Sequence, residues 1–192
     1  MKNLLKVSLL ALLAINIFSS RFSFTEEDLS LPSDNKWENI HSDYFIIYYR
    51  PDAGLKRIEK RLEIRRFFTE SDPDPLFSLQ KRVAYRMDAL YGRVREILQM
   101  YPKDVNAKIR IFKNRKELDK EYYRIFREKK SLKSFYIYRF NTIYLNEEDI
   151  SDSVVAHEMG HAVVDHYFAV RPSEKIREIL SQYVDIHLDD EF

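Results

Sequence analysis

The 192-residue sequence contains no cysteine. This absence excludes disulfides, thiolate zinc sites, iron–sulfur clusters and cysteine nucleophiles, so any metal must be held by histidine or carboxylate side chains. Only three glycines are present, which leaves no glycine-rich loop for a nucleotide phosphate. Because 32 basic side chains nearly balance 31 acidic ones, net charge does not attract the chain to nucleic acid, and we expect no nucleic-acid partner.

A short apolar run lies near the N-terminus. Residues 7–18 are apolar except for a serine and an asparagine, lysines precede them, and serines follow. This pattern predicts a secretory signal over residues 1–20, because the run is shorter than the roughly 20 residues that cross a bilayer. We therefore expect an exported protein, periplasmic or extracellular. The alternative is a chain anchored to the membrane by an uncleaved N-terminal segment.

The rest of the chain divides into a polar leader or linker over residues 21–36 and one domain over residues 37–192. In the domain, hydrophobic periods typical of strands and helices alternate, which predicts an α+β fold. The predicted strands are 43–49 and 107–112, followed by a hairpin over 134–146 that turns at Phe140 and Asn141. The predicted helices are 55–68, 77–100, a helix capped by Asn114 that ends near Arg127, 151–168, and one that opens at Pro172 and Ser173.

Basic residues are frequent between positions 56 and 66. Glutamates lie among them, so our first interpretation is a solvated helix face. The alternative is contact with an anionic membrane surface or an acidic partner through this 56–66 basic stretch.

The strongest chemical signal is the pentapeptide His157-Glu158-Met159-Gly160-His161. On a helix, residues four apart lie about 40° apart on one face, so the two imidazoles can take adjacent corners of a tetrahedral zinc site. Glu158 then stands beside the metal, where a general base is needed. The alternative is a buried helix whose two histidines are satisfied by hydrogen bonds.

Two further residues of this helix carry predictions. Gly160 costs about 1 kcal/mol in a helix relative to alanine, so we expect a neighbouring element to approach it closely. Asp165, one turn beyond His161, is placed either to orient a ligand imidazole or on the helix surface.

A catalytic zinc site needs a third protein ligand. His166 points to the opposite side of the helix from His157, so we look to the following helix. Glu178 lies opposite the centre of an apolar stripe that we expect to pack into the core, which would turn Glu178 toward the cleft; a solvent-facing glutamate is the alternative. Glu174 is the competing ligand. The stripe consists of Ile176, Ile179, Leu180, Tyr183, Val184 and His187.

These residues give the segment from Ser151 to Asp185 a family resemblance. It resembles the gluzincin zinc metallopeptidases, and the peptidase MA-like family in particular, whose last helix carries a glutamate, a leucine two residues later and a tyrosine five residues later. Glu178, Leu180 and Tyr183 match this pattern, and the start of the domain around Trp37 and residues 45–48 is similar to the family's opening strand.

The resemblance implies a zinc metallopeptidase that hydrolyses peptide bonds in a peptide or protein substrate. It implies one zinc ion held by His157, His161 and Glu178, with Glu158 as the general base. A second donor to the reacting carbonyl is expected, for which Tyr183, His187 and His166 are candidates.

The resemblance also implies a fold. We expect a small mixed sheet with an edge strand over the zincin-type helix, and then the glutamate-bearing helix. The edge strand is expected to be Thr142–Leu145, which would pair with the substrate backbone. The alternative function is a catalytically weak or inactive zincin-fold domain that binds a cell-envelope protein or peptide. A third interpretation is a membrane-anchored domain that contacts lipid through the 56–66 basic stretch.

Overall fold

The structure is a computed structural model that describes residues 37–63, 76–103 and 105–190. The predicted signal over 1–20, the leader over 21–36 and positions 64–66 of the 56–66 basic stretch lie outside the described residues. Among the helices of the described part, none is long and apolar enough to span a bilayer.

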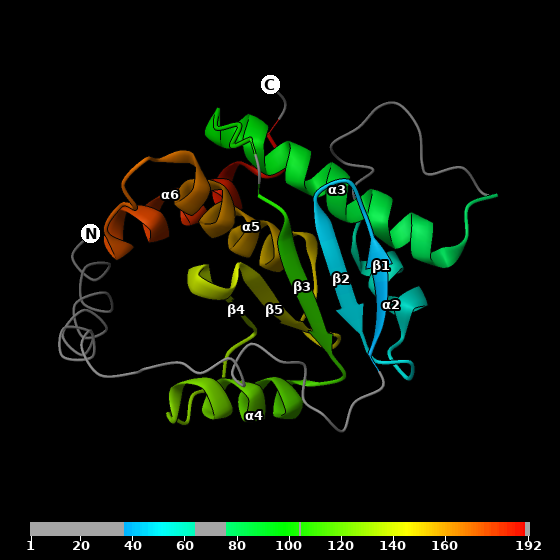
Figure 1. The fold of residues 1–192 in the computed structure, drawn as a ribbon. Coiled ribbons are helices and arrows are strands. Elements are labelled where there is room, and N and C mark those ends of the chain that lie inside the picture. The colour runs from blue at the N-terminus through cyan, green and yellow to red at the C-terminus, as the bar shows by residue number, and fades with distance from the viewer. Residues whose placement is uncertain (1–36, 64–75, 104, 191–192) are drawn as a thin grey trace, which may run out of the picture. The chain divides into compact units, whose positions relative to one another are not determined.

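The domain is α+β and is built on a five-stranded mixed sheet (Figure 1). Its strands lie in the order β1-β2-β3-β5-β4. The three central strands β2, β3 and β5 are parallel, and β1 and β4 are added antiparallel at the two edges. The strands are β1 Glu38–His41, β2 Phe45–Tyr49, β3 Ala107–Phe112, β4 Ser134–Ile137 and β5 Thr142–Asn146.

Helices α2 Leu55–Arg61, α3 Leu79–Leu98 and α4 Arg115–Phe126 lie in the connections that parallel strands require. Helices α5 Asp152–Tyr167 and α6 Glu174–His187 follow the last strand, and a 3₁₀ turn, η2 Tyr138–Phe140, joins β4 to β5. The side chain of Asn114 caps α4 by accepting a hydrogen bond from the amide of Glu117 at 3.0 Å. Ser151 caps α5 in the same way through the amide of Val154. The Asn114 cap and the hairpin confirm predictions made from the sequence.

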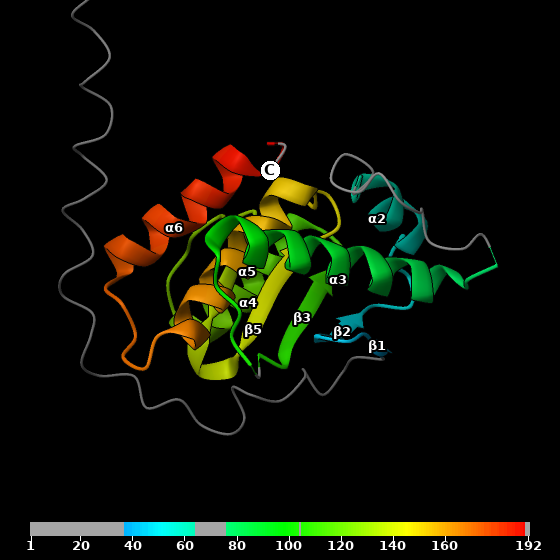
Figure 2. The ribbon, with the colours of Figure 1, turned by 90° about the horizontal axis from the view of Figure 1, so that it is seen from above.

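The sheet is covered on both faces. Helices α3 and α5 lie over one face, α4 lies over the other, and α6 lies beside α5 (Figures 1 and 2). The side of the sheet beneath α3 and α5 is lined by aliphatic side chains in matching register, with Ile109 opposite Ile143 and Ile111 opposite Leu145. All four are fully buried, and burial of each such side chain contributes about 1.5–3 kcal/mol to folding.

Two predictions of the fold are corrected by the structure. The segment Thr142–Leu145 was expected at the edge of the sheet, but β5 is paired on both sides and the edge strand is β4. The hairpin places its first strand outermost, which alternation alone does not reveal. The helix predicted over 55–68 ends at Arg61, and the remaining positions after Glu63 lie outside the described residues.

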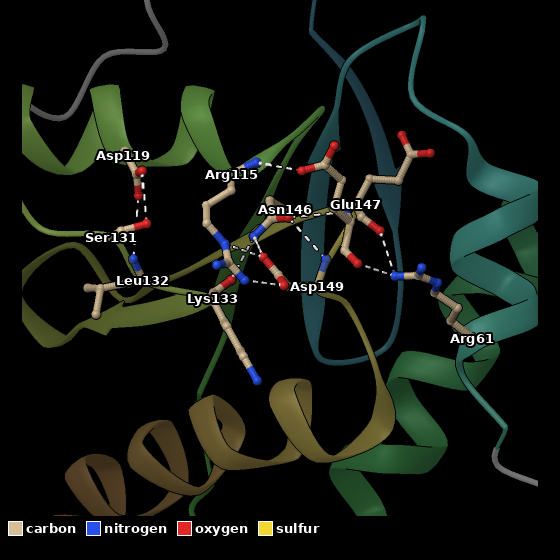
Figure 3. A network of polar contacts seen from close by, with 10 residues as sticks. Arg61, Arg115, Asp119, Ser131, Leu132, Lys133, Asn146, Glu147 and Asp149 are labelled. Carbon is tan, nitrogen blue, oxygen red and sulfur yellow. Dashed lines mark hydrogen bonds and ion pairs between the residues drawn. The ribbon is translucent and has the colours of Figure 1, made fainter.

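A polar network fixes the turn between β5 and α5 (Figure 3). The side-chain oxygen of Asn146 accepts hydrogen bonds from the amides of Glu148 and Asp149, both at 3.1 Å, and its NH₂ group donates to the carbonyl of Lys133 at 2.9 Å. Arg115 of α4 forms an ion pair with Asp149. The network ties the turn that leads into α5 to the segment that leads into β4, and α5 and β4 carry the candidate site.

Candidate metal centre

Helix α5 is buried along most of its length, as the sequence predicts. Val155, Met159 and Val163 are fully buried against the sheet and α3, which leaves the side of α5 that bears His157 and His161 facing α6 and β4. The exposed fractions of these two imidazole side chains are 22% and 16%. They are therefore sheltered from water but still accessible from the cleft.

Helix α6 crosses α5 at a contact between small residues. A Cβ atom added to Gly160 would lie 3.0 Å from the Oγ atom and 3.2 Å from the Cα atom of Ser181, closer than ordinary van der Waals contact. Ser181 is itself fully buried. This confirms the expected close approach at Gly160 and explains why glycine is accommodated inside the helix.

The close crossing also sets the rotation of α6, which differs from the prediction. Ile176, Ile179 and Tyr183 were expected in the core, but their exposed fractions are 49%, 53% and 42%. Val184 of the predicted stripe is buried as expected, but the face of α6 that packs inward is centred on Ser181 and Val184. Apolar periodicity misplaced the helix because the contact that orients it involves a serine and a glycine.

In this orientation Glu178 meets the two histidines of α5. One potential ligand atom from each of His157, His161 and Glu178 can be chosen so that all three lie within 4.8 Å of one another. The Nε2 atoms of His161 and His157 are 3.5 and 3.9 Å from the carboxylate oxygens of Glu178. Ligand atoms bound at about 2.0–2.2 Å around one tetrahedral zinc are separated by about 3.4 Å, so the three groups fit one ion.

The donor set also fits zinc chemically, since two imidazoles and a glutamate form a known catalytic zinc triad. Hydrogen bonding with His161 lowers the pKa of Glu178 to about 2, which keeps the carboxylate charged. Glu174, the competing ligand, lines the same cleft but does not belong to the group of converging ligand atoms.

A second carboxylate of α6 orients His157. The Nδ1 atom of His157 lies 2.9 Å from Oδ2 of Asp185, an acceptor that leaves Nε2 directed toward Glu178. Burial lowers the pKa of His157, but the hydrogen bond to Asp185 and the neighbouring carboxylates outweigh burial and raise it overall. This role of Asp185 was not predicted from the sequence, although the seven-residue spacing from Glu178 places Asp185 on the same side of α6.

Asp165 does not orient His161. Its carboxylate is completely buried and pairs with Arg171 at 2.7 Å and Arg177 at 3.3 Å. The Nδ1 atom of His161 is buried and has no hydrogen-bond partner in the described part of the chain. Asp165 therefore ties the loop after α5 and the start of α6 to α5.

Glu158 is buried beside the histidines, with an exposed fraction of 5%. The hydroxyl of Ser134, the first residue of β4, donates a hydrogen bond to its Oε1 atom at 2.7 Å. Burial raises the pKa of Glu158 and outweighs the opposing effects of the histidines and of Ser134. A carboxyl whose pKa is raised toward neutral pH can both accept and release a proton near that pH. Ser134 lies 24 residues before Glu158 in the sequence and carries no local signal for this role.

A cleft of about 310 Å³ opens over these groups. Its walls include Ser134 and Phe135 of β4, Tyr122 and Phe126 of α4, and Arg177 of α6. Because β4 is the edge strand, its main chain borders the cleft and could accept an extended peptide as a further strand.

The three residues considered as a second donor do not line this cleft. The Nε2 atom of His166 lies 3.1 Å from Oδ1 of Asn141, and His187 pairs with Asp190. Tyr183 is on the outer side of α6. Arg177, the residue directly before Glu178, is a cation in the wall of the cleft. It was not assigned to the site from the sequence.

Comparisons with protein-family models, with curated proteins and with solved structures find no match for this chain. The structure brings together the four residues predicted for the site, His157, Glu158, His161 and Glu178.

Proposed function

We propose that the protein is a zinc-dependent metallopeptidase. In this proposal His157, His161 and Glu178 hold one zinc ion, and Glu158 is the general base that promotes hydrolysis of a peptide bond. The observation that supports it most is the convergence of three ligand atoms within 4.8 Å beside a buried glutamate whose pKa is raised. Bound zinc would supply Lewis-acid chemistry, which polarises a carbonyl and lowers the pKa of water.

Glu158 has the properties that proton transfer requires. Its Oε1 atom is engaged by Ser134, so Oε2 is the atom left to take a proton from the attacking water. The water oxygen forms a bond to the carbonyl carbon, the carbon–nitrogen bond breaks, and Glu158 passes the proton from Oε2 to the departing amine. The low exposure of the carboxyl keeps bulk water from competing for this proton.

The surroundings of the site favour an extended peptide or a flexible protein segment as substrate. Main-chain groups of β4 would pair with the substrate backbone, and this pairing depends little on the side chains of the substrate. Tyr122, Phe126 and Phe135 offer apolar contact along the cleft, and Arg177 adds a positive charge near its α6 side. The proposed substrate is therefore defined by its extended shape more than by one residue.

We further propose that this activity is exported, as residues 1–20 predict. Two arginines of the 56–66 basic stretch already form contacts within the fold, and these contacts would compete with binding to a membrane surface. Arg57 lies 3.2 Å from a carboxylate oxygen of Glu147, and Arg61 donates to the carbonyl of the same residue at 3.2 Å. Among the described residues of this stretch, Lys56 and Lys60 are exposed, and Arg65 and Arg66 lie outside the described residues.

The test is hydrolysis of a mixed peptide library by the zinc-loaded protein and by a Glu158→Gln variant. We expect the variant to keep its zinc and to lose at least about 100-fold in rate, because it cannot accept the proton. Glu174→Gln is the matched control, since Glu174 lines the same cleft outside the ligand group, and it should stay active. Equal hydrolysis by wild type and Glu158→Gln would contradict the proposal. Zinc-dependent peptide binding without hydrolysis by the wild type would favour the alternative, an inactive zincin-fold domain that binds a cell-envelope protein or peptide.

A further inference from the structure

Arg177 brings an incompletely paired positive charge into the wall of the cleft. Its side chain is 15% exposed, and its Nη1 atom lies 3.3 Å from Oδ2 of the fully buried Asp165. Arg171 contacts the same oxygen at 2.7 Å, so two guanidinium groups share one carboxylate. A guanidinium carries five N–H donors, and Nη2 of Arg177 has no hydrogen-bond partner in the described part of the chain. One positive charge of this trio is therefore left without a matching negative charge.

We propose that Arg177 binds a carboxylate of the substrate, in an acidic side chain that precedes the hydrolysed bond. This inference rests on the proposed peptidase function and adds one charge preference to a substrate defined mainly by its extended shape. Arginine suits the role because its planar guanidinium forms paired hydrogen bonds with a carboxylate. The low exposure of Arg177 strengthens such a contact relative to one on the open surface.

The geometry of α5 places this contact relative to the reacting bond. Asp165, which holds Arg177, lies four residues beyond His161 on α5, a distance of about 6 Å along the helix. An extended peptide rises about 3.3 Å per residue. The carboxylate that meets Arg177 therefore belongs to a residue roughly one or two positions from the bond at the metal centre.

The direction of β4 indicates on which side of the bond this residue lies. Ser134, at the start of β4, contacts Glu158. Burial raises the pKa of Tyr136, two residues later, and the charge of Arg177 opposes this rise, so Tyr136 and Arg177 are near each other in the cleft wall. The strand thus runs from the base toward Arg177. Antiparallel pairing is slightly more stable than parallel pairing, and an antiparallel substrate would pass Arg177 before it reaches the base.

The other charged side chains of the cleft wall leave this preference to Arg177. Besides the ligand Glu178 and the base Glu158, the wall contains Lys130, in the loop before β4, and Glu174 of α6. Both side chains are exposed, so solvent and salt screen their charges more than that of Arg177. Their charges are also opposite in sign.

The test uses decapeptides with both ends capped, which differ only in a single glutamate or glutamine at successive positions. Binding is measured by fluorescence anisotropy with the Glu158→Gln protein incubated with zinc, and hydrolysis with protein that keeps Glu158. We expect glutamate before the hydrolysed bond to improve binding and kcat/KM about tenfold over glutamine, and Arg177→Gln to reduce this ratio below about twofold. An unchanged ratio in Arg177→Gln would overturn the proposal.

Arg171→Gln is the matched control, because Arg171 contacts the same carboxylate oxygen of Asp165 but is not among the residues that line the cleft. It should keep the preference for glutamate. Thermal unfolding shows whether each variant is folded. If Arg177→Gln leaves Asp165 too poorly paired to fold, the double variant Asp165→Asn/Arg177→Gln removes both charges and should also lack the preference. Equal loss of the preference in Arg171→Gln would mean that the ion-pair cluster acts only on the fold, and would overturn the proposal.

Peptides without glutamate but with a free C-terminal carboxylate distinguish the two sources of the charge. A preference for the free C-terminus that depends on Arg177, without one for glutamate, would overturn the assignment to a side chain and indicate a parallel substrate held by its end. Hydrolysis with neither preference would contradict this inference and leave the proposed function standing. Binding that depends on glutamate and Arg177, without hydrolysis by the wild type, would contradict the peptidase function alone.

Discussion

The Nδ1 atom of His157 lies 2.9 Å from the carboxylate of Asp185, two helical turns along α6 from Glu178. Helix α6 thus presents two carboxylates to the histidines of α5, one placed to be a ligand and one to fix an imidazole. Carboxylate–histidine pairs of this kind set the tautomer of a ligand and strengthen its bond to the metal. The orientation of His157 therefore depends on the same helix crossing that brings Glu178 into the site.

Replacement of Asp185 by alanine should weaken zinc binding without unfolding the protein. We expect an affinity loss of about 10- to 100-fold, because His157 loses the acceptor that holds its ring. The measurement is competition with a chromophoric chelator. Asp190→Ala is the matched control, since Asp190 also contacts a histidine Nδ1 atom, that of His187, which lies outside the ligand group. Equal affinities of the two variants would show that Asp185 does not position a ligand.

Ser134→Ala should change the pH dependence of peptide hydrolysis. The hydrogen bond from Ser134 opposes the effect of burial by stabilising the charged form of Glu158, so its removal raises the pKa of Glu158 further. The base must be unprotonated to act, and the acidic limb of the kcat/KM profile should therefore move to higher pH.

The control for this pH shift is Ser131→Ala. Ser131 also donates to a carboxylate, that of Asp119 at 3.1 Å, but it lies on the surface. The acidic limb of the kcat/KM profile of Ser131→Ala should lie at the same pH as that of the wild type. An unchanged limb in Ser134→Ala, or a shift to lower pH, would show that Ser134 does not tune Glu158.

Gly160→Ala tests the helix crossing. The new methyl group would meet the Cα atom of Ser181 at 3.2 Å, a backbone contact that is relieved only if α6 moves. Overpacking costs about 1–3 kcal/mol and the gain in helix propensity returns about 1 kcal/mol, so we expect a net loss of roughly 1 kcal/mol in unfolding free energy. Zinc affinity should fall as well, because Glu178 moves with α6.

Gly92 provides the comparison for this substitution. It also lies inside a helix, α3, and a Cβ atom there would meet nothing within 4 Å. Gly92→Ala should stabilise the protein by up to about 1 kcal/mol in urea unfolding and leave zinc affinity unchanged. Stabilisation of similar size in both variants would mean that the α5–α6 contact is looser than the structure indicates.

Local signals predicted much of the fold and the centre of the site. The strand Ala107–Phe112 and the helix cap at Asn114 follow from short-range patterns, and the structure confirms them. The proximity of His157 and His161 follows from helix geometry alone. Each of these features depends on residues that lie within a few positions of one another.

Features that depend on long-range packing were predicted less well. The rotation of α6 is set by the close contact between Gly160 and Ser181, and the pattern of large apolar residues does not indicate that contact. The position of Glu178 near the histidines was predicted, but Ile176, Ile179 and Tyr183 of the apolar stripe invoked for it are exposed. Ser134 reaches Glu158 only because β4 is the edge strand, an order that the sequence did not reveal.

The most direct test of the metal centre is the zinc content per chain of the wild type beside Glu178→Ala and Glu174→Ala, each incubated with zinc and then dialysed. We predict one zinc in the wild type and in Glu174→Ala, and much weaker retention in Glu178→Ala, because of these two glutamates it is Glu178 that has carboxylate oxygens within reach of both histidines. Absence of zinc from all three would contradict the metallopeptidase proposal. Equal retention by wild type and Glu178→Ala would contradict the assignment of Glu178 as the third ligand.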